Sequence, residues 1–145
     1  MATMNQPTRT AWTLALLGVI PFLGLGTAAA VGTMEITPEA AREVLSLYGA
    51  VIVAFLAGAR WGAASAGARA SDGVLVLSNL FPLAAWAALA LAGVGSAVAL
   101  GALGLCLLAQ LAWDWPVSAP GYRRLRLTAT VGAVGGLALG LISGL

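Results

Sequence analysis

The sequence has 145 residues, of which 61% are hydrophobic and only 8% are charged. Roughly a quarter of the residues of an ordinary soluble domain are charged, so a soluble fold could not cover its core here. The mean hydropathy of +0.98 belongs to membrane proteins, and the length suits one domain over residues 1–145. The composition therefore predicts an all-α integral membrane bundle.

Charge and side-chain chemistry exclude several classes of partner. Seven basic residues, all arginine, face five acids, and charges this sparse do not indicate nucleic-acid binding. The chain has no histidine, and its one cysteine, Cys106, lies inside an apolar run. A transition-metal or haem site would lack its usual ligands. We therefore predict no cofactor, no metal and no nucleic acid, with the lipid bilayer as the main surrounding.

The transmembrane spans follow from long, nearly uncharged stretches. A helix needs about 20 residues to cross roughly 30 Å of hydrocarbon. Gly and Pro inside such stretches are tolerated because neighbouring helices can satisfy the freed backbone groups. Five stretches meet or approach this length, which predicts a bundle of five transmembrane helices. The spans are residues 12–31, 44–66, 74–92, 96–113 and 127–145.

The orientation follows from the arginines outside the spans. With the N-terminus in the cytoplasm, only Arg42 lies on the far side. Arginines near cytoplasmic span ends set the topology of membrane proteins. The sequence therefore predicts a multi-pass protein of the bacterial inner (cytoplasmic) membrane, with a cytoplasmic N-terminus and the C-terminus outside. The arginines assigned to the cytoplasm are Arg9, Arg69, Arg123, Arg124 and Arg126.

An alternative interpretation makes residues 1–30 a cleaved signal peptide. Ala28 and Ala30 form the A-x-A pattern of a cleavage site after an apolar stretch. The apolar run is longer than is usual for a signal peptide, however, and only Arg9 precedes it. We therefore favour a retained first span, and an intact N-terminus on the mature protein would exclude cleavage.

Small residues repeat every four positions in two spans. In lipid, helices associate mainly by close backbone approach along such residues. We therefore expect the two stripes to seat helices against one another within one bundle, and a homo-oligomer interface along the last span is the alternative. The predicted helix-packing residues are Gly58 and Gly62 in the second span and Gly132, Gly136 and Gly140 in the last.

Polar residues enter three neighbouring spans at a similar depth. Arg60 is the one charge well inside a span, where a charged side chain is costly. Asp114 is the acid best placed to meet it, with Asp72 as the alternative. We predict a polar layer in which Asp114 holds Arg60 while Asn79 and Gln110 complete its hydrogen bonds. The competing interpretation has Arg60 snorkelling to lipid phosphates.

A basic connector precedes the last span. It comprises Tyr122, Arg123, Arg124 and Arg126. Anionic lipid attracts basic residues near the membrane surface. The connector is expected to anchor the topology, and a specific site for a head group or a protein partner is the alternative.

Three motifs together suggest a family. They are the stretch over residues 48–62, which ends in Ala59-Arg60-Trp61-Gly62, the tripeptide at residues 20–22, and the segment over residues 122–126. With them the chain resembles the family called domain of unknown function 3429, which is similar to mitochondrial transmembrane protein 69. The pattern departs at Ala57, where the family leads us to expect a second glycine. The resemblance implies a membrane setting and this helix count, and it implies no activity.

The residues that the chain lacks help to distinguish an enzyme from other kinds of membrane protein. An enzyme needs a nucleophile, acid or base in a workable place, and the chain offers no histidine and no loop long enough for a lid. We therefore predict no enzymatic activity. The favoured function is a structural or accessory membrane subunit that packs against a protein partner or itself. The alternative is the binding or transport of a small solute, lipid or quinone through the polar layer around Arg60.

Overall fold

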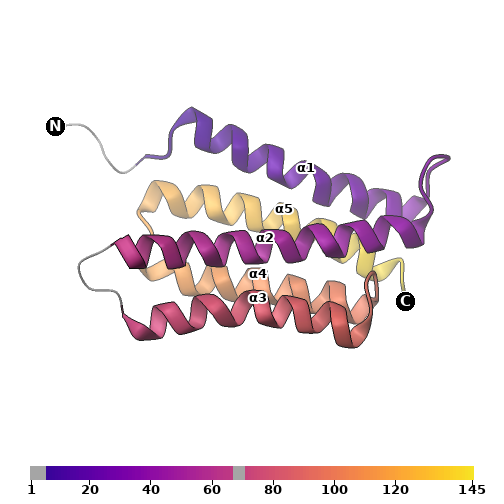
Figure 1. The fold of residues 1–145 in the computed structure, drawn as a ribbon. Helices are drawn as coiled ribbons and strands as arrows, with labels where there is room; N and C mark the ends of the chain where they lie inside the picture. The colour runs from indigo at the N-terminus through magenta and orange to yellow at the C-terminus, as the bar shows by residue number, and fades with distance from the viewer. Residues whose placement is uncertain (1–5, 67–70) are drawn as a thin grey trace.

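The computed structural model describes residues 6–66 and 71–145, and this part of the chain forms five antiparallel helices (Figure 1). The helices run up and down, so the starts of α1, α3 and α5 share one end with the ends of α2 and α4. We call this end the N-side and the opposite end, where the chain terminates, the C-side. The helices are α1 (Arg9–Val31), α2 (Pro38–Ala66), α3 (Asp72–Ala92), α4 (Ala97–Asp114) and α5 (Pro120–Ile142), with a short 3-10 helix, η1 (Trp115–Val117), before α5.

All five helices are long and apolar enough to cross a membrane, which confirms the predicted helical membrane bundle. Four of them begin earlier than the uncharged stretches predicted, and α2 and α5 differ most, by six and seven residues. Helix α2 begins at Pro38 rather than Val44, because the Thr37 hydroxyl accepts the backbone N–H of Ala40 at 3.2 Å and caps its start. Helix α5 begins at Pro120 rather than Leu127, and proline is favoured in the first helical turn. Caps and prolines, not charges, therefore set these helix starts.

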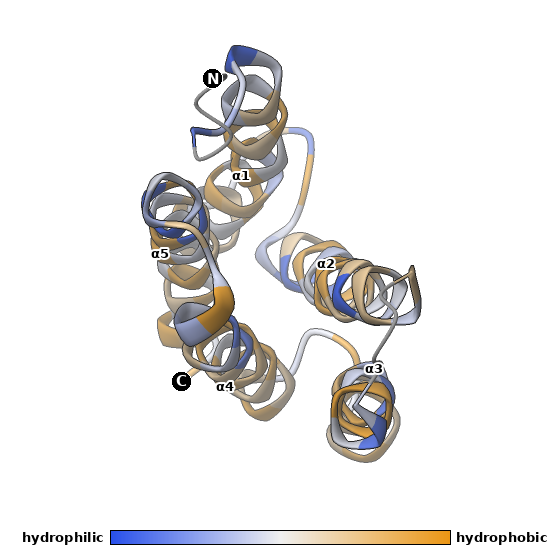
Figure 2. Ribbon diagram, turned by 90° about the vertical axis from the view of Figure 1, so that its left-hand side faces the viewer, coloured by the Kyte–Doolittle hydropathy of each residue, from blue (hydrophilic) through white to orange (hydrophobic). Residues whose placement is uncertain are grey.

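The helices form a closed ring in the order α1, α5, α4, α3 and α2 (Figure 2). The core lies inside this ring, where Phe22, Leu45, Leu103 and Leu137 are each at most 2% exposed. Large apolar side chains also cover the outside of every helix, as a surrounding of lipid tails allows. The hydrophobic core is therefore narrow, and helix contacts must be close to hold it together.

The closest contact joins α1 and α5 in their C-side halves. A Cβ atom on Gly26 would meet the backbone of Gly136, and one on Gly136 would meet the backbone of Phe22. Gly132 similarly lies against Val19, and Gly140 lies against Leu45 at 2.7 Å from the position a Cβ would take. The glycines of α5 thus face helices of the same chain, and Gly26 belongs to the same contact although its spacing did not single it out.

The prediction for the small residues of α2 is wrong. Gly58 and Gly62 are exposed, and nothing lies within 4 Å of a Cβ built on either. The buried face of α2 instead carries Gly49, Val53 and Ala57, a stripe with the same spacing but one residue earlier. One residue turns a helix by roughly 100°, so spacing alone could not choose between these faces. Ala57, where glycine was expected, is 1% exposed and lies on the buried face.

The contact between α1 and α5 can be tested with two neighbouring glycines. Gly136→Ala should destabilise the protein by about 1–3 kcal/mol, because the added methyl meets the Phe22 backbone, which cannot rotate away. Gly135→Ala is the matched control, since nothing lies within 4 Å of a Cβ there and alanine favours the helix by up to about 1 kcal/mol. Thermal unfolding in detergent measures both, and equal effects would contradict the close contact.

Candidate functional site

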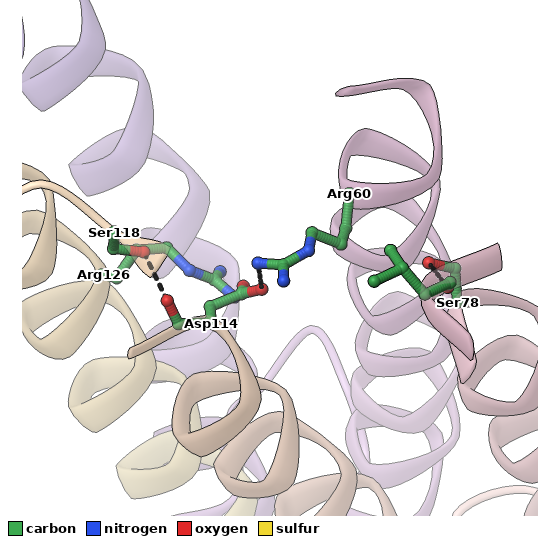
Figure 3. A network of polar contacts seen from close by, with 6 residues as sticks. Arg60, Ser78, Asp114, Ser118 and Arg126 are labelled. Carbon is green, nitrogen blue, oxygen red and sulfur yellow. Dashed lines mark hydrogen bonds and ion pairs between the residues drawn. The ribbon is translucent and has the colours of Figure 1, made fainter. Parts of the chain in front are cut away.

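The carboxylate of Asp114 joins three helices at the N-side. Helix α4 ends at Asp114, and η1 turns the chain directly into α5. The Arg60 Nη1 of α2 donates to Asp114 Oδ1 at 3.0 Å, and the Arg126 Nη2 of α5 donates to Oδ2 at 2.7 Å (Figure 3). The Ser118 hydroxyl donates to the backbone oxygen of Asp114 at 2.7 Å. One acid therefore holds two guanidinium groups from opposite sides, and we call these three charged residues the arginine–aspartate triad.

The triad is shielded from its surroundings. The side chains of Arg126, Asp114 and Arg60 are 6%, 15% and 19% exposed. The Arg60 guanidinium also lies 4.6 Å from the centre of the Trp113 ring, a geometry in which a cation is attracted to the aromatic face. Coulomb attraction is stronger here than at a water-exposed surface, so the two ion pairs fix the N-side ends of α2, α4 and α5 relative to one another.

The triad leaves donors and charge unmatched. A guanidinium has five N–H donors, and the Nε of Arg126 is buried without a hydrogen-bond partner. Two arginines share one carboxylate, so the triad carries a formal charge of +1. An unpaired donor in an apolar setting is costly.

The amides predicted to complete the layer do not reach Arg60. Gln110 is 1% exposed, but its Nε2 donates to the backbone oxygen of Val53 at 2.9 Å, and its Oε1 lacks a partner. Asn79 is exposed and donates to the oxygen of Leu75 in its own helix at 2.8 Å. Nearby backbone oxygens accept from both amide nitrogens instead, so this part of the prediction is wrong. Of the predicted layer, the structure brings only Arg60 and Asp114 together.

The basic connector divides into surface and interior residues. Tyr122 and Arg124 are exposed, and Arg123 lies 5.5 Å from the Trp115 ring. Arg126 differs, because it turns inward to Asp114 and was expected on the membrane surface. The helix face offered a signal for this: residues 126, 130, 133 and 137 are all buried, and intervals of three and four residues keep side chains on one face.

Two cavities meet at the triad. The apolar groove, of about 470 Å³, lies between α1, α2 and α5, and the polar chamber, of about 550 Å³, lies at the N-side between α2, η1 and the starts of α3 and α5. Of the two cavities, Arg60 and Asp114 line only the chamber. Leu56, Tyr122 and Arg126 line both cavities, so the groove and the chamber adjoin at these three side chains.

The guanidinium groups determine which ligands the site could bind. In the described part of the chain, no group of three or more His, Cys, Asp or Glu side chains could hold a metal ion. The site can instead offer hydrogen-bond donors and positive charge to an oxyanion, as arginine does in many anion sites.

The fold and this site define a multi-pass helical membrane protein with a buried cationic centre. The family described as Protein of unknown function (DUF3429) matches residues 7–142, and the chain belongs to this family. Neither a curated protein nor a solved structure matches the chain. The similarity to mitochondrial transmembrane protein 69 stays a prediction.

A double-mutant cycle tests the pairing of Arg60 with Asp114. Asp114→Leu alone strands two cations and should cost on the order of 3–5 kcal/mol, less where water reaches the pair. Arg60→Leu combined with Asp114→Leu should cost less than the sum of the two single changes, because the double change leaves only Arg126 without a partner. Thermal unfolding in detergent gives the coupling, and additive effects would show that the ion pair contributes nothing to stability.

Proposed function

We propose that this protein binds a membrane amphiphile, with an apolar chain in the groove and a polar head in the chamber. The observation that carries the proposal is the junction of the two cavities at Leu56, Tyr122 and Arg126. An apolar channel that ends at a buried cation matches a ligand that is apolar at one end and polar at the other. Binding of this kind was the alternative that the polar layer suggested.

The groove is placed to receive a chain from the bilayer. Figure 1 shows α1 inclined to the other helices, close to α2 at the C-side and diverging from it toward the N-side. Leu14 and Phe55 line the groove and are 63% and 67% exposed, so the surrounding lipid tails reach its rim. A chain can therefore enter sideways without crossing a polar surface.

Contacts between α1 and α2 border the groove. The Tyr48 hydroxyl donates to the backbone oxygen of Gly18 at 2.8 Å, and the Phe22 and Tyr48 rings contact edge to face with centres 4.9 Å apart. Gly18 and Phe22 both line the groove, so these contacts join α1 to α2 beside it. Its volume of about 470 Å³ lies within the range of roughly 300–1,000 Å³ typical of ligand sites.

The orientation belongs to the proposal as well. If the N-side faces the cytoplasm of a bacterial inner membrane, the chamber lies at the level of the inner-leaflet head groups. The cytoplasmic surface of the membrane is rich in anionic lipids, and the exposed Arg124 would contact them. A head group could then enter the chamber from the leaflet while its chain follows along the groove.

Reporter fusions test this orientation. Fusions after Gly67 and after Leu145 should report opposite sides of the membrane, with the first in the cytoplasm, because an odd number of crossings separates them. A phosphatase reporter active only outside and a fluorescent reporter active only inside form the matched pair. Both fusions on one side would mean that the number of crossings is wrong.

An accessory role is the second proposal, and the exposed face of α2 favours it. Gly58 and Gly62 leave a smooth strip with nothing within 4 Å, and small residues allow a helix of another subunit to approach closely. Purification in gentle detergent with mass spectrometry separates the two proposals. A stoichiometric protein partner supports the accessory role, whereas a copurifying amphiphile supports binding.

Filling the groove tests the amphiphile proposal directly. Ala15 lines the groove from α1, and Ala15→Trp should weaken the binding of radiolabelled hexadecyl amphiphiles to protein in lipid nanodiscs at least ten-fold, because the indole occupies the path of the chain. Ala84→Trp, on an exposed position of α3, is the matched control and should leave binding unchanged. Equal binding by both variants and the wild type would overturn the proposal.

A further inference from the structure

We infer that the polar chamber selects a head group that is a singly charged oxyanion, either a carboxylate or a phosphodiester. The inference rests on the proposed function and adds the charge and chemical class of the head group. It follows from the charges, donors and acceptors that the chamber wall provides.

The charge of the chamber is the first argument. Arg60, Asp114 and Arg126 are the charged side chains among the described residues of its wall, and they sum to +1. Arg123 is turned to the Trp115 ring and Arg124 is exposed, and neither lines the chamber. One negative charge would therefore balance these described side chains, which lowers the cost of burying charge away from water.

The hydrogen-bonding groups are the second argument. Arg126 is 5% exposed and its Nε is buried with no partner, although Arg126 lines the chamber. A carboxylate or phosphodiester oxygen is the kind of acceptor that pairs well with a guanidinium group lining such a chamber. Because the guanidinium is planar and its Nη2 is already fixed to Asp114, the direction of the remaining donors is fixed before a ligand arrives.

Zwitterionic and neutral heads fit less well. Each oxygen of Asp114 already accepts a hydrogen bond from an arginine, so an ammonium group would compete with two guanidinium groups for this carboxylate. The cation of a zwitterionic head would lie beside a net positive wall without a partner. A neutral hydroxyl head could accept a hydrogen bond from a guanidinium group, but it would bring no negative charge to the positive wall.

A doubly charged head is disfavoured for the opposite reason. A phosphate monoester carries close to two negative charges above its second pKa of about 6. The triad can neutralise one of them, and the second would stay uncompensated in a shielded setting. Asp114 thus has two effects, because it holds the arginines in place and removes one of their two charges.

Four probes that share one hexadecyl chain test the inference. Hexadecyl sulfate and hexadecyl phosphate have tetrahedral heads but differ by about one charge at pH 8.5, while hexadecylphosphocholine is zwitterionic and hexadecanol is neutral. Each radiolabelled probe is added as a minor component to nanodiscs of zwitterionic lipid that hold the wild-type protein. We expect sulfate to bind at least ten-fold more tightly than each of the others, and equal binding of sulfate and phosphocholine would overturn the inference.

A charge series assigns the selectivity to the triad. Asp114→Asn raises the formal charge of the chamber to +2 and should shift preference from sulfate toward phosphate. Arg60→Gln lowers it to zero and should abolish the preference of sulfate over phosphocholine, whereas Arg60→Lys keeps the charge and should retain that preference. Should Asp114→Asn fail to fold, the Arg60 pair alone decides, and unchanged selectivity in Arg60→Gln would overturn the assignment.

The same measurements separate the inference from the proposal beneath it. If all four hexadecyl probes bind alike and Ala15→Trp weakens them all, the groove binds chains and only the charge selectivity is wrong. If no probe binds, the proposed function itself fails. If hexadecyl sulfate is preferred, hexadecanoate and dihexadecanoylphosphatidylglycerol distinguish the natural source of the anionic head. Tighter binding of hexadecanoate indicates a free fatty acid, and tighter binding of the second lipid indicates a phospholipid.

Discussion

The N-side half of this bundle depends on one carboxylate shared by two guanidinium groups. Without Asp114, Arg60 and Arg126 would be like charges facing one another in a shielded place, and each would have to leave the interior or lose its hydrogen bonds. The ion pairs, at 3.0 and 2.7 Å, connect α2, α4 and α5. The C-side is held differently, by backbone contact between Gly26 and Gly136. Close backbone packing thus stabilises the C-side of the bundle, and ion pairs stabilise the N-side.

This division explains why a groove exists beside α1. Helix α1 is tied to α5 by glycine contacts in its C-side half and to α2 by the bond between Tyr48 and Gly18. The ion pairs at the N-side join α2, α4 and α5, and none of those described involves α1. Its N-side half can therefore diverge from α2, and the space that opens ends at Arg126. The groove and the cationic chamber are consequences of the same arrangement.

The sequence predicted the helices because an apolar run of this length can only be a span, whereas faces and partners required tertiary information. Depth alone matched Arg60 with Asp114, since both lie near N-side span ends. The inward orientation of Arg126 was not predicted, because counting arginines by membrane side treats every arginine at a span end as a surface anchor. In α2, two apolar stripes with the same four-residue spacing differ by one position, and only packing shows that Ala57 faces inward and Gly58 outward.

The uncompensated charge is difficult to explain by stability. Buried ion pairs contribute little on balance, and apolar residues of similar volume are often as stable or more so. An odd cation is worse, because its burial has no matching Coulomb gain, and the unpaired Nε of Arg126 adds a further cost. Apolar residues of similar volume at these positions would avoid both costs. The arrangement is reasonable if an anion from outside the chain supplies the missing charge and acceptor, since a ligand that binds only the folded state returns part of that cost as binding free energy.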